Sequence, residues 1–159
     1  MSSHFRFSTA AALALICATA PLLAASTPTP AQNAVRTRIA GLKEMGTAFK
    51  NAMDGLRGSA PQMILIQQSA RTIKNSSQAM FTWFPAGSGP ARGLKTAAKP
   101  EIWSKPVEFR AAQDGLARAA DAFQTAAMSG NADAIRAAAR GLGGACKNCH
   151  DQFRVPDQH

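Results

Sequence analysis

Two cysteines and a histidine lie close together near the end of the chain, in the stretch CKNCH. Cys146 and Cys149 are three residues apart, so on a helix their thiols share one face. Two thiols at this spacing can form thioethers with both vinyl groups of one porphyrin. His150 follows directly and can turn its imidazole toward the iron. The pattern C-x-x-C-H is the attachment motif of a c-type haem, and it predicts covalent haem with His150 as an axial iron ligand.

Three other interpretations of this motif remain to be weighed. A structural zinc site needs four ligands, and beyond the motif the exported chain offers only His159. A thioredoxin-like dithiol is expected after a strand in a βαβ setting, which the sequence does not indicate. A plain disulfide, common in exported proteins, would close a very small loop and leave His150 unexplained. Haem attachment is therefore the favoured interpretation.

Apolar residues recur at steps of three, four or seven in four stretches, and this spacing is typical of amphipathic helices. We find no convincing alternation of apolar and polar residues that would indicate strands. The four stretches contain, in order, Val35, Ile39, Leu42, Phe49, Met53 and Leu56; Met63, Ile66, Ala70, Ile73, Met80 and Phe84; Phe109, Leu116 and Phe123; and Ile135 and Leu142.

The connections between these stretches predict the topology. Residues 85–100 are rich in Gly and Pro without periodicity, which indicates a long loop. Pro100 and Pro106 suit early positions of the third helix. That helix is expected to stop at the SGN stretch, where Asn131 can cap the fourth. The sequence thus predicts an all-α, antiparallel four-helix bundle with a long loop between helices 2 and 3.

The start of the chain has the layout of a secretory signal. Arg6 precedes an uncharged apolar run, and small residues follow it before a Pro- and Thr-rich stretch. We therefore expect residues 1–25 to be removed as a signal peptide, and Cys17 with them. Residues 26–33 would be a linker and 34–159 the haem domain. This layout predicts export to the periplasm.

The chain is basic, with a formal net charge of +9 at pH 7. Its basic residues are scattered singly, with no run and little aromatic interleaving, so nucleic acid is not an expected partner. We expect instead a soluble surface with a bias toward anionic partners.

With these motifs in view, the chain resembles the class II cytochromes c, the cytochrome c-prime family, over essentially its whole exported part. The stretch GACKNCHDQFR resembles the haem helix of that family. FPAGSGP followed by KPEIWS resembles its long loop and the entry to its third helix, and VRTRIAGLKEMGTAFK resembles its first helix.

The resemblance implies roles for individual residues. Cys146 and Cys149 would bind haem covalently and His150 would be the proximal ligand. Arg154, one helical turn further, would lie beside that histidine. Arg38 would lie near a haem propionate, with an ordinary solvent-facing arginine as the alternative.

The resemblance also implies which residues face the opposite side of the haem. Leu42 matches the position from which low-spin members supply a methionine, and leucine has no donor atom. The iron would then be five-coordinate and high-spin. Met45 is the alternative sixth ligand, although a methionine at helical spacing is more often core filler. Phe84 would be a distal-pocket aromatic, or simply part of the core.

Two functions follow as expectations. The first is electron transfer with a redox partner protein, and the second is binding or scavenging of nitric oxide or carbon monoxide on the distal face of the haem. No set of residues suggests an enzyme. The resemblance further implies homodimers, formed through the first two helices.

Overall fold

The computed structural model describes residues 27–156. The expected signal peptide, Cys17 and His159 lie outside the described residues. Four long helices make up most of the described chain: α1 (Pro30–Gly55), α2 (Met63–Ala79), α4 (Pro106–Ser129) and α5 (Ala132–Phe153). A 3-10 turn, η1 (Met80–Thr82), extends α2, and a four-residue helix, α3 (Glu101–Ser104), precedes α4.

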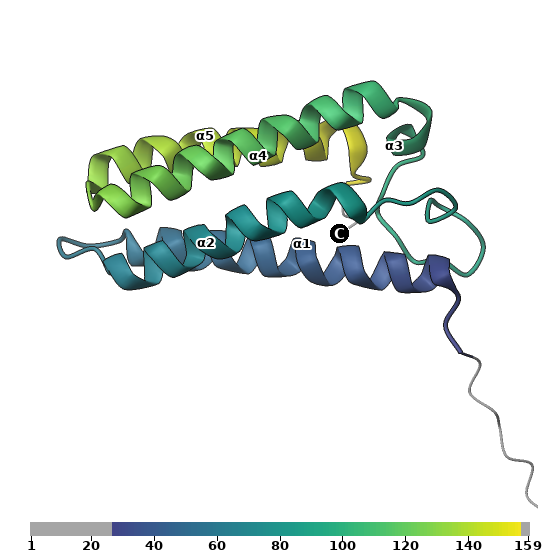
Figure 1. The fold of residues 1–159 in the computed structure, drawn as a ribbon, viewed down its shortest axis with the longest axis horizontal. Coiled ribbons are helices and arrows are strands. Elements are labelled where there is room, and N and C mark those ends of the chain that lie inside the picture. Colours follow the sequence, from purple (N-terminus) through teal and green to yellow (C-terminus); the bar gives the residue numbers. More distant parts are fainter. Residues whose placement is uncertain (1–26, 157–159) are drawn as a thin grey trace, which may run out of the picture.

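The long helices form an antiparallel bundle. Figure 1 shows α1 and α2 as one layer and α4 and α5 as the other, with successive long helices running in opposite directions. Within the layers, α1 packs against α2 and α4 packs against α5. Between the layers, α2 packs against α4. The long connection between α2 and α3 lies at one end of the bundle, where α1 begins and α5 ends. The expected all-α four-helix bundle is confirmed.

The ends of the helices follow local capping chemistry. Thr29 and Gln32 form a capping box at the start of α1, with Pro30 in its first turn, so the helix begins inside the expected linker. Asn131 caps α5 by accepting from the backbone N–H groups of Asp133 and Ala134, as expected. Gly130 ends α4 with a φ of 70°, a conformation that glycine adopts without penalty.

The third expected helix is interrupted. It consists of α3 and α4, separated at Lys105, which has φ −126° and ψ 60°. The cause is Pro106, because its ring disfavours helical backbone in the residue before it. The interruption lets α3 turn away from the axis of α4 and cover the end of the bundle (Figure 1).

The core contains two clusters of buried apolar side chains. The larger one fills the middle of the bundle, and the smaller one lies at the end where α3 packs on α4 and α5. In the first apolar stripe Ile39 and Leu42 are 49% and 37% exposed, so they are not core residues as the periodicity indicated. On α1 the buried face consists of Val35, Arg38, Gly41, Met45, Ala48, Ala52 and Gly55.

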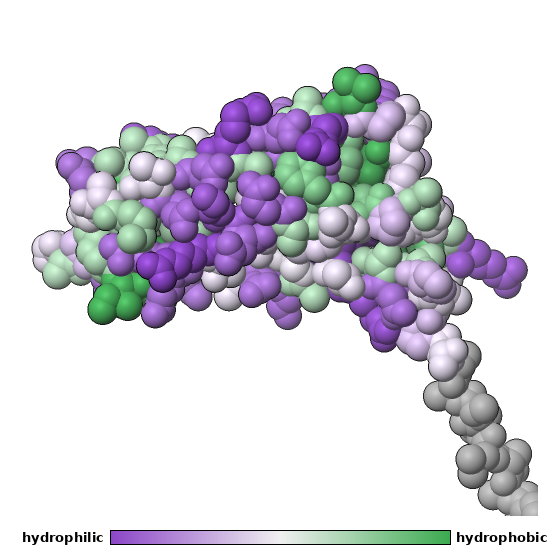
Figure 2. All heavy atoms as spheres, viewed as in Figure 1, coloured by the Kyte–Doolittle hydropathy of each residue, from purple (hydrophilic) through white to green (hydrophobic). Residues whose placement is uncertain are grey.

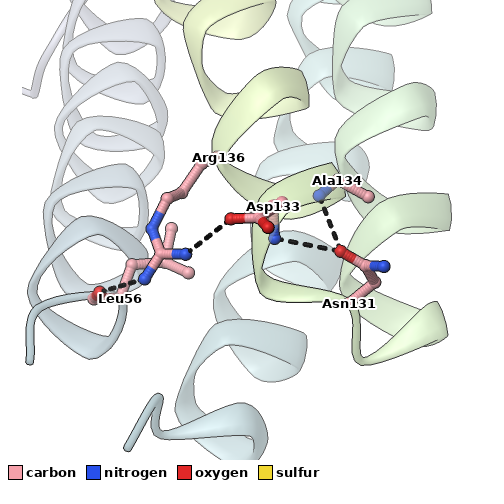
Figure 3. A network of polar contacts seen from close by, with 5 residues as sticks. All are labelled: Leu56, Asn131, Asp133, Ala134 and Arg136. Atoms are coloured by element: carbon pink, nitrogen blue, oxygen red, sulfur yellow. Dashed lines mark hydrogen bonds and ion pairs between the residues drawn. The ribbon is translucent and has the colours of Figure 1, made fainter. Parts of the chain in front are cut away.

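A polar network ties the opposite end of the bundle together (Figure 3). The Arg136 guanidinium on α5 pairs with Asp133 at 3.0 Å and donates to the carbonyl oxygen of Leu56 at 3.4 Å. Leu56 is the C-cap of α1, so this contact links the end of the first helix to the start of the last.

Polar and apolar side chains are mixed over the face of the molecule drawn in Figure 2. Among the helices of residues 27–156, none combines the length and the apolar character needed to cross a bilayer.

Two helical glycines predict opposite effects of substitution. A Cβ added at Gly41 of α1 would lie 2.2 Å from Cη2 of the buried Trp83, whereas one at the exposed Gly141 of α5, away from the cavity, would meet nothing within 4 Å. Gly41→Ala should therefore lower the free energy of unfolding by about 1–3 kcal/mol through overpacking. Gly141→Ala should raise it by about 0.5–1 kcal/mol, because alanine is the better helix former. Urea denaturation of both variants checks this, and equal effects would contradict the packing.

Candidate functional site

A cavity of about 680 Å³ lies toward the loop end of the bundle. Its walls come from α1, α2, α4, α5 and the loop before α3, and they are mainly apolar, as ligand cavities usually are. The structure brings all the sequence-predicted site residues to this one cavity: Arg38, Leu42, Met45, Phe84, Cys146, Cys149, His150 and Arg154.

The helix α5 carries the motif. Cys146 and Cys149 are half-buried in the cavity wall and have free thiols, and His150 is exposed. Burial raises the pKa of the Cys146 thiol. Burial, with a smaller contribution from the neighbouring Cys146, raises the pKa of Cys149 to about 11. A raised pKa disfavours the thiolate that a redox dithiol uses.

The zinc interpretation would require four ligands close together. Within residues 27–156, no three His, Cys, Asp or Glu side chains are grouped so that they could hold a metal ion. His159, which would have been needed as a fourth ligand, lies outside the described residues.

Arg38 projects from α1 into the cavity wall and is only 1% exposed, so the solvent-facing alternative is wrong. Its guanidinium donates to Ser88 Oγ at 2.9 Å, to the Ser88 carbonyl at 2.7 Å and to Thr96 Oγ1 at 2.7 Å. It also lies over the rings of Phe84 and Trp103, at 5.3 and 5.7 Å from their centroids. Burial lowers the pKa of Arg38 from its ordinary value. A buried cation with neutral acceptors is a suitable partner for an anionic group in the cavity.

Two further residues of α1 face the cavity differently. Leu42 lines it and is 37% exposed, so its side chain can contact a group bound there. Met45 is 6% exposed and belongs to the main core cluster, although it also reaches the cavity wall. The packing of Met45 is that of core filler, in keeping with its flexible side chain.

Phe84 is both cavity lining and core. It packs against both apolar clusters, and its ring meets Phe109 edge-on with a centroid distance of 4.9 Å. Phe109 in turn meets Phe153 at 5.1 Å. These rings form an aromatic wall that joins the segment after η1, α4 and the end of α5.

Arg154 does not continue the haem-motif helix as expected. α5 ends at Phe153, and Arg154 has extended backbone that pairs with Ala98 in an isolated antiparallel bridge. The helix stops here because the backbone turns to hydrogen-bond the loop: Val155 N–H donates to the Ala97 carbonyl at 2.8 Å. Arg154 still lines the cavity, from a strand-like rather than a helical position.

The loop contributes a part of the cavity wall that the sequence did not indicate. Lys95, Thr96, Ala97 and Ala98 all line the cavity, and Ser88 is completely buried beneath Arg38. These residues show no periodicity. The only indication of their role was the resemblance of FPAGSGP and KPEIWS to the long loop of the family. The residues around the cavity are consistent with a flat apolar group that carries acidic substituents, because apolar walls adjoin two thiols, an imidazole and a buried guanidinium.

Known proteins resemble the chain in sequence. A family model described as "Cytochrome C'" matches residues 33–154. The cytochrome c' of Pararhodospirillum photometricum is 34% identical over 120 residues, which are 76% of this chain and 94% of that protein.

Solved structures resemble it in fold. A nitric oxide complex of a variant of cytochrome c prime from Alcaligenes xylosoxidans is 28% identical, with a TM-score of 0.71 over 79% of this chain and 97% of the other. A carbon monoxide-bound variant of the same protein matches with the same identity, TM-score and coverage. The chain belongs to the cytochrome c' family, whose members bind haem c covalently.

Proposed function

We propose that Cys146 and Cys149 hold the haem through thioethers and that His150 is its proximal ligand. The observation that carries this proposal is the position of all three residues on one helix, at the wall of one apolar cavity. The bound haem supplies an iron that can change oxidation state by one electron and can bind a diatomic gas. Covalent attachment suits a small bundle, because retention then does not depend on enclosing the group fully.

Arg38 supplies positive charge for the haem propionates in this proposal. Its guanidinium is 1% exposed and lines the cavity, so a carboxylate there would meet it with little competition from water. Arg154 adds a second positive charge to the wall at the end of α5.

We further propose that the iron is five-coordinate and high-spin. Leu42 faces the cavity and offers no donor atom, and Met45 is packed in the core. An apolar distal side favours small neutral ligands over those that need polar stabilisation.

The chain acts in electron transfer under this proposal. Lys147, Asn148 and Asp151, beside the motif on α5, are exposed, so the haem helix presents a surface that a partner protein can approach. The full chain has a net charge of +9, and removal of residues 1–25 takes only Arg6 from this total, so the exported protein stays basic and favours an acidic redox partner. The pattern of residues 1–25 supports export to the periplasm as the place where this exchange occurs. The proposal involves no catalytic step.

A second candidate function is the binding or scavenging of nitric oxide or carbon monoxide. A leucine rather than a donor residue at the cavity face of α1 favours it. Relatives of the same fold have been solved with nitric oxide and with carbon monoxide. Both candidates use the same attachment and differ in what approaches the distal side.

The coordination proposal is tested by the visible spectrum of the reduced holoprotein. We expect a high-spin spectrum, ready binding of carbon monoxide, and no change of either in Met45→Leu, since the Met45 sulfur is placed in the core. A sharp low-spin spectrum that becomes high-spin in Met45→Leu would contradict a five-coordinate iron.

The distal role of Leu42 is tested by adding the missing donor. Leu42→Met should give a low-spin, six-coordinate spectrum and should lower the carbon monoxide association rate by about tenfold or more, because the thioether must leave first. Ile39→Met, on the same helix and also at the cavity, is the matched control and should stay high-spin. If both variants remain high-spin and bind carbon monoxide alike, Leu42 does not face the iron.

A further inference from the structure

The long loop spans the cavity between two helices that are distant in sequence. On one side it contacts α1, where Arg38 reaches Ser88 and Thr96. On the other side it contacts the end of α5, where Lys99 N–H donates to the Phe153 carbonyl at 2.9 Å and Val155 N–H donates to the Ala97 carbonyl at 2.8 Å. The loop residues between these contacts form part of the cavity wall.

The Arg38 guanidinium holds two separate points of the loop at once. Nη1 donates to Ser88 Oγ, while Nη2 donates both to the Ser88 carbonyl and to Thr96 Oγ1. The planar fork of an arginine can make such divergent bonds, whereas the single ammonium of lysine cannot reproduce them. One side chain of α1 therefore connects Ser88 and Thr96, two residues that lie eight positions apart in the loop.

The side chain of each acceptor residue, Ser88 and Thr96, makes a further hydrogen bond within the loop. Ser88 Oγ donates to the Pro85 carbonyl at 2.8 Å, and Thr96 Oγ1 accepts from Ala98 N–H at 3.1 Å. Ser88 is 0% exposed, so separating it from Arg38 would leave buried polar groups without these bonds. The arrangement is thus costly to open at Arg38.

Two aromatic rings complete the attachment. Phe84 precedes the loop and Trp103 follows it in α3, and the guanidinium lies over both. The Trp103 indole N–H also donates to the Pro85 carbonyl at 3.1 Å. Arg38 is consequently enclosed by residues from both ends of the loop.

We propose that Arg38 is a positioning residue that fastens the loop over the cavity and so limits the access of small molecules to it. This role is distinct from supplying charge to a propionate. The part of the proposal that concerns gas access rests on the proposed haem function, whereas the fastening of the loop does not.

Hydrogen exchange of backbone amides in the holoprotein tests the fastening. Arg38→Lys keeps the charge but loses the fork. Thr96→Val keeps Arg38 but removes one of its acceptors together with the local bond from Ala98 N–H, so faster exchange in Thr96→Val alone would count against Arg38 as the fastening residue. Both variants should speed exchange of the Lys99 and Val155 amides by about tenfold or more, as expected for loss of a charge-assisted hydrogen bond. Exchange in the middle of α2 and α4 should be unchanged. Arg36→Lys is the matched control, because Arg36 is exposed on the same helix and bonds Asn33 locally.

Carbon monoxide association to the reduced holoprotein tests the access. It should be faster in Arg38→Lys and Thr96→Val than in the native protein and in Arg36→Lys. Unchanged exchange of the loop amides in both variants would overturn the proposal, since Arg38 would then act only as a charge. Faster exchange with unchanged association would overturn it too, because the loop would not close the cavity. If the native protein bound no carbon monoxide, the gas-binding function would fail, while the exchange comparison would still decide the fastening.

Discussion

The structure depends on one constraint, the presentation of two thiols and an imidazole by a single face of α5. Cys146, Cys149 and His150 are fixed relative to one another by the helix, so the remaining elements need only shape the space beside them. α1 contributes Leu42 and Arg38 from across that space, and Phe84, just after η1, closes its end together with Phe109 of α4. Covalent attachment to one helix explains how a small bundle can carry a large cofactor at a partly open site.

The positive charge of Arg38 also depends on how neighbouring groups are placed. Arg38 is buried among neutral acceptors and rings, which is unfavourable for a cation unless its hydrogen bonds are well placed. The same guanidinium belongs to the cavity wall and to the loop contact, so it couples the chemistry of the bound group to the position of residues 88–98. A substitution at Arg38 thus acts on charge and on geometry together, and only variants that separate the two can assign its role.

Much of the fold could be predicted from the sequence because the signals are local. The helical periodicity, the Asn131 cap and the glycine stop at Gly130 involve residues within a few positions of one another. The haem motif is local in the same way. The interruption at Lys105 was also within reach, since Pro106 restricts the residue before it.

The rest depended on contacts between distant residues. The acceptors of Arg38 lie 50 and 58 positions away, in a loop without periodicity, so nothing near Arg38 indicates its burial. Ile39 and Leu42 fit an apolar stripe, but they face the cavity rather than the core. Arg154 was expected on a helix that instead ends to pair with Ala98. The expectation of homodimers remains a prediction.

The most direct test is the intact mass of the matured protein after denaturation in acid. Covalent attachment through Cys146 and Cys149 predicts a chain that still carries the mass of one haem when fully unfolded. In the double variant Cys146→Ser, Cys149→Ser, the same treatment should leave the bare chain. A native chain that lost its haem on unfolding would contradict the attachment on which this account of the site rests.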